Sequence, residues 1–227
     1  MRILLISLVL LFGTVLLGQD AEDLNRCVPG HKTSGEGLRE PAFFEFVLSA
    51  SIEEIKNKKQ DIQFNKLDNR GGSVIYNAAT RRYYFREESI EDHLELMKFF
   101  VENGALIYAI NESDGLRSEI CGLVAGDTLE LFEYLLSIEP HLANIKCSYR
   151  QRNKKTVMVP IAESVKSPDE GDLIFAFVYK NREKEYIRNK AKVKQAKLKL
   201  LKEAKARAAT VPLTYTASVK LSAPRCE

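Results

Sequence analysis

Two stretches of the chain share one pattern of hydrophobic and polar positions. Between residues 93 and 105 the apolar side chains fall three, six and seven residues after Leu94, which puts them on one face of a helix. Asn103-Gly104 ends this stretch, because glycine accepts the left-handed conformation that follows many helices. The pattern returns 35 residues later at Leu129–Leu136. Weaker copies begin at Ile52 and Leu173, so the sequence predicts a series of similar helices.

Short segments that precede these helices also correspond to one another. They are Pro41-Ala42-Phe43-Phe44, Ser73-Val74-Ile75-Tyr76, Ser118-Glu119-Ile120-Cys121 and Thr156-Val157-Met158-Val159. Together with the helices they resemble the ankyrin repeat, a unit of about 33 residues with two antiparallel helices and a projecting finger. The resemblance implies an all-α, ankyrin-like solenoid of about four degenerate helix-turn-helix repeats over residues 41–179. The alternative is an irregular helical bundle whose amphipathic helices look alike by chance.

The segments depart from the family pattern in one respect, because none has the histidine that normally helps to tie neighbouring fingers together. Phe44 and Tyr76 stand at that position in the first two units, and we expect them to compensate by packing. In the third unit the position holds Cys121, and Cys147 falls in the next finger. The resemblance therefore implies a Cys121–Cys147 disulfide between neighbouring units. Pairing of the other two cysteines, Cys27 with Cys226, then follows.

The beginning of the chain is typical of a secretory signal peptide. A basic residue, Arg2, precedes an apolar run from Ile3 to Leu17, and small and polar residues follow. The run is shorter than the 20 or so apolar residues that a transmembrane helix needs. We interpret residues 1–18 as a signal cleaved after Gly18, an uncleaved anchor being the alternative. The mature chain is then extracytoplasmic (secreted or periplasmic), has no transmembrane segment, begins with an extension over residues 19–40, and meets conditions that allow disulfides.

Charge is unevenly distributed along the 227 residues. Residues 180–207 hold twelve Lys or Arg and three Glu, a balance of +9, so the rest of the chain carries −6 of the total of +3. Residues 180–209 lack Pro and Gly and predict a basic helix that continues from Leu173, followed by an extended tail at 210–227. A thin apolar stripe lets this helix pack against something; its members are Ile187, Ala191, Leu198, Leu201 and Ala208.

Two interpretations of the basic helix remain open. It binds an anionic membrane or polyanion surface, with Lys190, Lys194, Lys197 and Lys202 as the candidate contacts, or it is a solvated helix that caps the acidic repeats. Export argues against nucleic acid as a partner.

Candidate protein-binding residues lie in an insertion and in a finger. Residues 81–88 place three arginines around three aromatics, residue types that dominate protein interfaces. Residues 106–111 are more apolar than ankyrin fingers usually are. The candidates are Arg82, Tyr84, Tyr108 and Ile110. In both places the alternative is that the apolar side chains fill gaps under the loop or help neighbouring fingers pack.

Nothing in the sequence indicates a catalyst, a metal site or a cofactor. The three histidines are scattered, and no nucleophile elbow or phosphate-binding glycine loop is present. Asn111-Glu112-Ser113 matches the N-glycosylation pattern. Three hypotheses follow, of which the first is a non-enzymatic module that binds a protein partner through fingers and inner helices. The others are an adaptor for anionic surfaces and an inhibitor or immunity protein of an extracytoplasmic enzyme.

Overall fold

The structure is a computed structural model that describes most of the chain between residues 23 and 213. The described residues are 23–24, 26–29, 39–81, 88–112, 117–124, 128–150, 156–166 and 183–213. They form a mostly helical fold with two small antiparallel sheets of two strands each. The predicted signal peptide (1–18) lies outside the described residues, as do Arg82, Tyr84 and most of the predicted tail (214–227).

The elements follow one another in short steps along the chain. The α-helices are α1 (Ala42–Ser49), α2 (Ile52–Asn57), α3 (Val74–Thr80), α4 (Ile90–Glu102), α5 (Leu129–Ile138), α6 (Ile161–Lys166) and α8 (Glu183–Ala208). The 3-10 turns are η1 (Lys59–Asp61), η4 (Cys121–Leu123) and η5 (Pro140–Asn144). The sheets pair β1 (Cys27–Pro29) with β2 (Arg39–Pro41), and β3 (Lys146–Arg150) with β4 (Thr156–Pro160).

Serine side chains start several of the helices. Ser51 and Ser89 each form a capping box with the acidic residue three positions on, Glu54 and Asp92. The hydroxyl of Ser73 accepts the backbone N–H of Tyr76 at 3.0 Å and so begins α3. These bonds satisfy N–H groups that have no partner within a helix, so each helix starts at a residue that the sequence specifies.

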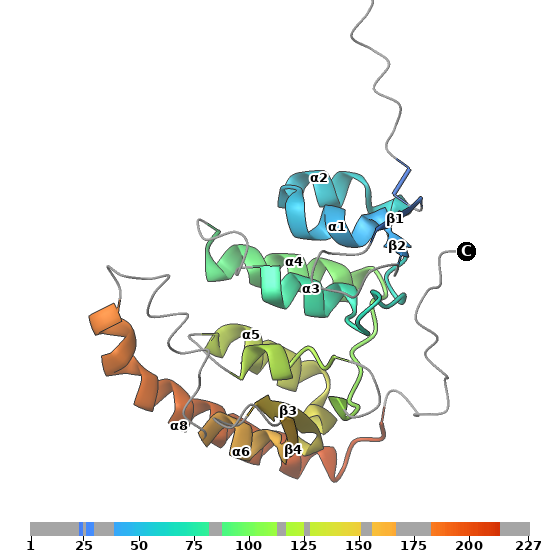
Figure 1. Cartoon of the computed structure of the whole chain (residues 1–227). Helices are drawn as coiled ribbons and strands as arrows, with labels where there is room; N and C mark the ends of the chain where they lie inside the picture. The colour runs from blue at the N-terminus through green and yellow to red at the C-terminus, as the bar shows by residue number, and fades with distance from the viewer. Residues whose placement is uncertain are drawn as a thin grey trace, which may run out of the picture.

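The helices form layers around one continuous core (Figure 1). In sequence order, α1 and α2 lie against α3 and α4, which lie against η4 and α5; the contacts run from α1 to α3, from α2 to α4, and from α4 to α5. Fully buried side chains such as Phe43, Ile75, Phe100 and Phe132 fill the space between the layers. Their burial supplies the main driving force for the stacking.

Several predicted elements are confirmed and one is corrected. The two strong helical patterns form α4 and α5, and the segments at Pro41 and Ser73 lie at the starts of α1 and α3. The segment at Ser118 leads into η4, which is a short 3-10 turn and not an α-helix. The segment Thr156–Val159 was expected to open a helix, but it is strand β4, paired with β3 from Cys147↔Val159 to Arg150↔Thr156. The all-α class is therefore corrected to mostly helical.

The basic helix lies against the last layer of the fold. Its described part, α8, contacts η5, α5 and α6. From the predicted apolar stripe, Leu201 and Ala208 are buried, Leu198 is half-buried and Ala191 is exposed. The C-terminal half of the stripe thus packs against the stack, while residues 173–182 lie outside the described residues.

Candidate functional site

Three loops, which we call the fingers, precede the helical layers at residues 62–73, 104–118 and 145–160. The first and second are joined by polar contacts. The side-chain oxygen of Asn65 accepts the backbone N–H of Leu106 at 2.9 Å, and the backbone oxygen of Asn65 accepts the Tyr108 hydroxyl at 3.3 Å. Further along, the N–H of Arg117 donates to Gly71 O at 2.8 Å. These bonds fix the second finger in register with the first.

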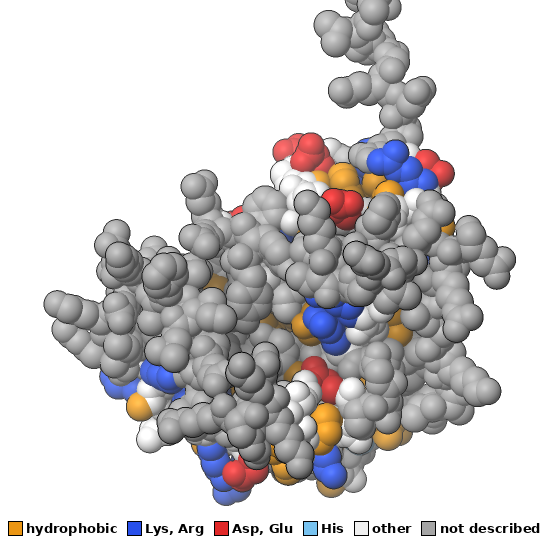
Figure 2. Space-filling view, in the orientation of Figure 1, with side chains coloured by type: hydrophobic (Ala, Val, Ile, Leu, Met, Phe, Trp, Pro, Cys, Tyr) orange, Lys and Arg blue, Asp and Glu red, His pale blue; other side chains and the backbone are white. Residues whose placement is uncertain are grey.

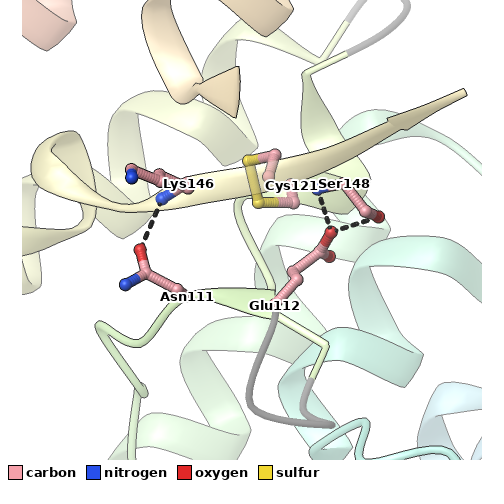
Figure 3. Close-up of a disulfide and its surroundings, with 6 residues drawn as sticks. Asn111, Glu112, Cys121, Lys146 and Ser148 are labelled. Carbon is pink, nitrogen blue, oxygen red and sulfur yellow. Dashed lines mark hydrogen bonds between the residues drawn. A yellow bond between two sulfur atoms is a disulfide. The ribbon is translucent and has the colours of Figure 1, made fainter. Parts of the chain in front are cut away.

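The second and third fingers are joined in the same manner (Figure 3). The side-chain oxygen of Asn111 accepts the N–H of Lys146 at 2.7 Å. One carboxylate oxygen of Glu112 accepts both the N–H and the hydroxyl of Ser148 at 2.6 Å. Side chains of the second finger therefore pair with the backbone of β3, and the described parts of the three fingers form one connected edge.

A disulfide adds a covalent link between the third layer and the third finger. Cys121 of η4 is bonded to Cys147 of β3, with their Cα atoms 5.5 Å apart (Figure 3). This confirms the pairing that the repeat register implied. Cys226 lies outside the described residues, so its pairing with Cys27 stays a prediction.

The predicted binding residues of the second finger are only partly accessible. The Tyr108 side chain is 4% exposed, and Ile110 is half-buried. The buried position of Tyr108 favours the alternative role of packing between fingers. Glycosylation of Asn111 also stays a prediction, because Ser113 of its motif lies outside the described residues.

Arg81 and Glu88, which flank residues 82–87, form an ion pair in which Arg81 is buried and Glu88 is half-buried. Arg81 is fully buried and donates to Val47 O at 2.6 Å and to Ala50 O at 2.5 Å, at the end of α1. Its Nε also donates to the Glu88 carboxylate at 2.9 Å, and Nη2 donates to the other oxygen of the same group. Arg81, one of the three arginines of the predicted interface, is therefore a structural residue that holds the end of α3 against the end of α1.

A second arginine is arranged differently, at the junction of the second finger with α3. The Arg117 guanidinium lies over the Tyr76 ring, 5.6 Å from its centroid, and Nη1 donates to the Tyr76 hydroxyl at 3.2 Å. Burial raises the pKa of Tyr76. A side chain at Gly122 would meet Thr80 at 3.2 Å and Tyr76 at 3.4 Å, so this glycine lets η4 approach α3 closely. Sequence reasoning assigned Tyr76 to packing and overlooked Arg117.

A buried carboxyl group lies beneath the junction of the first two fingers. Glu119 is fully buried, and one of its oxygens accepts the Ser73 hydroxyl at 2.6 Å. Burial raises the pKa of Glu119 to about 7, although hydrogen bonds from Ser73 and from the backbone of Glu119 and Tyr108 oppose the shift. The other oxygen, and the hydroxyl of neighbouring Ser118, have no hydrogen-bond partner in the described part of the chain. The junction therefore carries a group that titrates near neutral pH.

Charge separates between the fingers and the second helices of the layers. Accessible charged side chains of the described finger residues are mostly basic: Lys66, Arg70, Arg117 and Lys146, against Glu112. The exposed charged side chains of α4 and α5 are mostly acidic: Glu91, Glu95, Glu102, Glu130 and Glu133, against Lys98. The fingers thus form a locally basic edge, whereas the exposed faces of α4 and α5 are acidic.

Helix α8 provides another basic surface, but one of its predicted contacts is wrong. Lys197 is 1% exposed, and its ammonium donates to Leu123 O at 2.8 Å, Thr128 Oγ1 at 3.1 Å and Val124 O at 3.2 Å. It also lies over the Phe132 ring at 5.3 Å. Because every donor position faces the protein, Lys197 anchors α8 and does not meet an anionic surface.

The other predicted lysines of α8 reach solvent. Lys190 and Lys194 are half-buried and Lys202 is exposed. Lys192, Lys199 and Lys205 are exposed as well, and basic side chains follow the lower edge of the molecule in Figure 2, where Figure 1 shows α8. The helix therefore carries an accessible basic face opposite its packed one.

The described residues contain neither a metal-binding cluster nor a membrane-spanning helix. Within the described residues, no group of three or more His, Cys, Asp or Glu side chains is placed to hold a metal ion. None of the helices in the described part of the chain is both long and apolar enough to span a membrane. No family model matches the sequence, and no curated protein or solved structure matches it either.

Proposed function

We propose that the protein is an exported, ankyrin-like module without chemistry of its own, which binds a protein partner through its fingers and inner helices. The observation that carries the proposal is the continuous set of bonds between the fingers. Asn65, Asn111 and Glu112 each connect one finger to the next, and the disulfide ties the third finger to η4. A preorganised edge loses little conformational freedom when a partner binds.

The charge of the edge supports a partner with an acidic surface. Four accessible basic side chains and one acidic one lie on the described fingers, whereas α4 and α5 are acidic. Complementary charge speeds the encounter of two proteins and orients them. A partner with an acidic face is attracted to the fingers and repelled by α4 and α5.

The repeat order of the helices supports the ankyrin-like part of the proposal. Layers of helices follow one another with fingers between them, and within the described residues the larger contacts of α1 to α5 run between layers that are neighbours in sequence order. Export is supported by the signal pattern at the start of the sequence and by the Cys121–Cys147 disulfide, a bond that persists in oxidising compartments.

Charge reversal at two separate places tests the proposal. The finger variant carries Lys66→Glu and Lys146→Glu, and the matched helix variant carries Lys202→Glu and Lys205→Glu. All four lysines are exposed, and both variants change the formal charge by the same amount. The mature protein and both variants are immobilised and exposed to the extracytoplasmic fraction of the source cells, and the retained proteins are quantified by mass spectrometry. We expect a partner that the finger variant loses and the helix variant keeps. Equal retention by all three contradicts the proposal.

A second candidate function, binding to an anionic surface, rests on α8. Lys192, Lys199, Lys202 and Lys205 are exposed on this helix, and the acidic side chain accompanying them in the described face is Glu203. Such a face predicts binding to vesicles rich in phosphatidylserine that falls steeply with added salt. The helix variant then loses vesicle binding and the finger variant keeps it. Binding that resists salt, or that survives in the helix variant, excludes this candidate.

A further inference from the structure

The unusual feature of the finger edge is the way in which Arg117 is held. Its Nη1 is engaged by the Tyr76 hydroxyl, and the ring of Tyr76 supports the guanidinium from one side. Among the described residues no group hydrogen-bonds to Arg117 Nε or Nη2, and the residue is half-buried. The side chain therefore presents a pair of parallel N–H donors from a half-buried, fixed position.

The same pair of donors binds a carboxylate elsewhere in this molecule. Arg81 uses Nε and Nη2 to hold the two oxygens of Glu88, with a distance of 2.9 Å for Nε. This two-point arrangement is the geometry in which arginine recognises carboxylates most strongly. Arg81 and Arg117 thus differ in one respect: Glu88 of the same chain supplies a carboxylate to Arg81, whereas no described residue supplies one to Arg117.

Two described acidic groups that act on Tyr76, Glu112 and Asp68, already have hydrogen-bond partners of their own. Glu112 accepts the N–H and hydroxyl of Ser148. Asp68 accepts the N–H groups of Arg70 and Gly72 at 2.8 Å through one oxygen, and the Asn77 amide through the other. No ion pair links Arg117 to any carboxylate in the described ranges.

We infer that Arg117, supported by Tyr76, is the position that receives an acidic side chain of the protein partner. The ligand is an Asp or Glu carboxylate within an acidic segment, bound side-on by Nε and Nη2. Accessible basic residues on neighbouring fingers, Arg70 and Lys146, favour a segment that carries several such side chains. This inference rests on the proposed function and names the partner's chemistry and its point of contact.

The test uses a probe of defined chemistry and a signal from the arginine itself. Mature protein labelled with ¹⁵N-arginine is titrated with hexaglutamate, acetylated at its N-terminus and amidated at its C-terminus, while the Nε–H resonances are followed by NMR. The Arg117 resonance is assigned as the one that Arg117→Gln removes. We expect a saturable shift of that resonance, and at least tenfold weaker binding for Arg117→Lys, which keeps the charge but loses the two-point geometry.

Matched probes and variants separate the possible failures. Hexaglutamine with the same end groups is expected to cause no shift, and the helix variant Lys202→Glu/Lys205→Glu is expected to retain the response. The inference is overturned if hexaglutamate causes no shift of the Arg117 resonance. It is also overturned if the resonance responds only to an N-acetylated glycine peptide with a free C-terminal carboxylate, and not to the side-chain carboxylates of hexaglutamate. If Arg117→Gln still captures the partner that the finger variant loses, the inference fails while the proposed function stands.

Discussion

The buried carboxyl group of Glu119 makes stability depend on pH in a way that a single substitution removes. Glu119 is fully buried, and its pKa of about 7 compares with an ordinary value of 4.5. The folded protein therefore holds this proton more tightly than the unfolded chain does. As pH rises from about 4.5 to about 7, the unfolded state ionises first and the free energy of unfolding falls. Above about 7 both states are ionised and the loss is complete.

The size of the effect follows from the difference between the two pKa values. Each pKa unit corresponds to about 1.4 kcal/mol, so the difference amounts to about 3 kcal/mol between pH 4.5 and pH 8. Full burial means that solvent does not screen this effect. Glu119→Gln keeps an oxygen that can accept the Ser73 hydroxyl but has no proton to lose in this range. The variant's stability relative to wild type is expected to rise by about 3 kcal/mol over the same interval.

Urea unfolding followed by circular dichroism at 222 nm measures both proteins at a series of pH values. Other groups that titrate contribute equally to wild type and variant, so they cancel in the difference. Glu130→Gln, at an exposed position on α5, serves as the matched control and is expected to parallel wild type. If the Glu119→Gln profile also parallels wild type from pH 4.5 to pH 8, the argument about the buried carboxyl is refuted.

Three other substitutions test the contacts that hold the layers together. Lys197→Met removes the side-chain donor to Val124 O and one of the two side-chain donors to Leu123 O, the other being the Thr128 hydroxyl. It is expected to lower the unfolding free energy by about 2 to 4 kcal/mol, against about 0.5 kcal/mol or less for exposed Lys199→Met; equal effects contradict the anchoring role. Replacing both Cys121 and Cys147 by serine opens a loop with a sequence separation of 26 and is expected to lower the unfolding free energy by about 3 kcal/mol. Amide hydrogen exchange in β3 is expected to become faster, and unchanged exchange argues against a stabilising role of the disulfide. Arg81→Met removes the two donors that hold the Glu88 carboxylate and those to Val47 O and Ala50 O, and is expected to cost about 3 kcal/mol or more by urea unfolding. Adding Glu88→Gln should recover part of the loss, and no recovery contradicts the ion-pair account.

The features that the sequence predicted well are those with a local or periodic signal. Helices α4 and α5 show the spacing of one helix face, and α8 lacks helix breakers over a long basic run. The disulfide required one more step, since matching the repeats was needed to bring Cys121 near Cys147. The predicted repeat register placed Cys121 and Cys147 in neighbouring units, and that was enough to predict their disulfide.

The features that were missed depend on residues far apart in sequence. Lys197 is buried because carbonyl groups more than 70 residues earlier surround it, and nothing in its own neighbourhood distinguishes it from the exposed lysines nearby. Arg117 similarly depends on Tyr76, 41 residues earlier. Strand β4 was misassigned for a different reason: its short apolar run fits a helix or a strand, and its β-branched residues, Thr156, Val157 and Val159, together with pairing to β3, decide for the strand.

The measurement that tests the central claim most directly is partner capture by three proteins compared in parallel. These are the mature wild type, the finger variant Lys66→Glu/Lys146→Glu and the helix variant Lys202→Glu/Lys205→Glu, each exposed to the extracytoplasmic fraction of the source cells. A protein that wild type and the helix variant retain, and that the finger variant loses at least tenfold, is the predicted result. A partner retained equally by the finger variant, or lost only by the helix variant, contradicts binding through the finger edge.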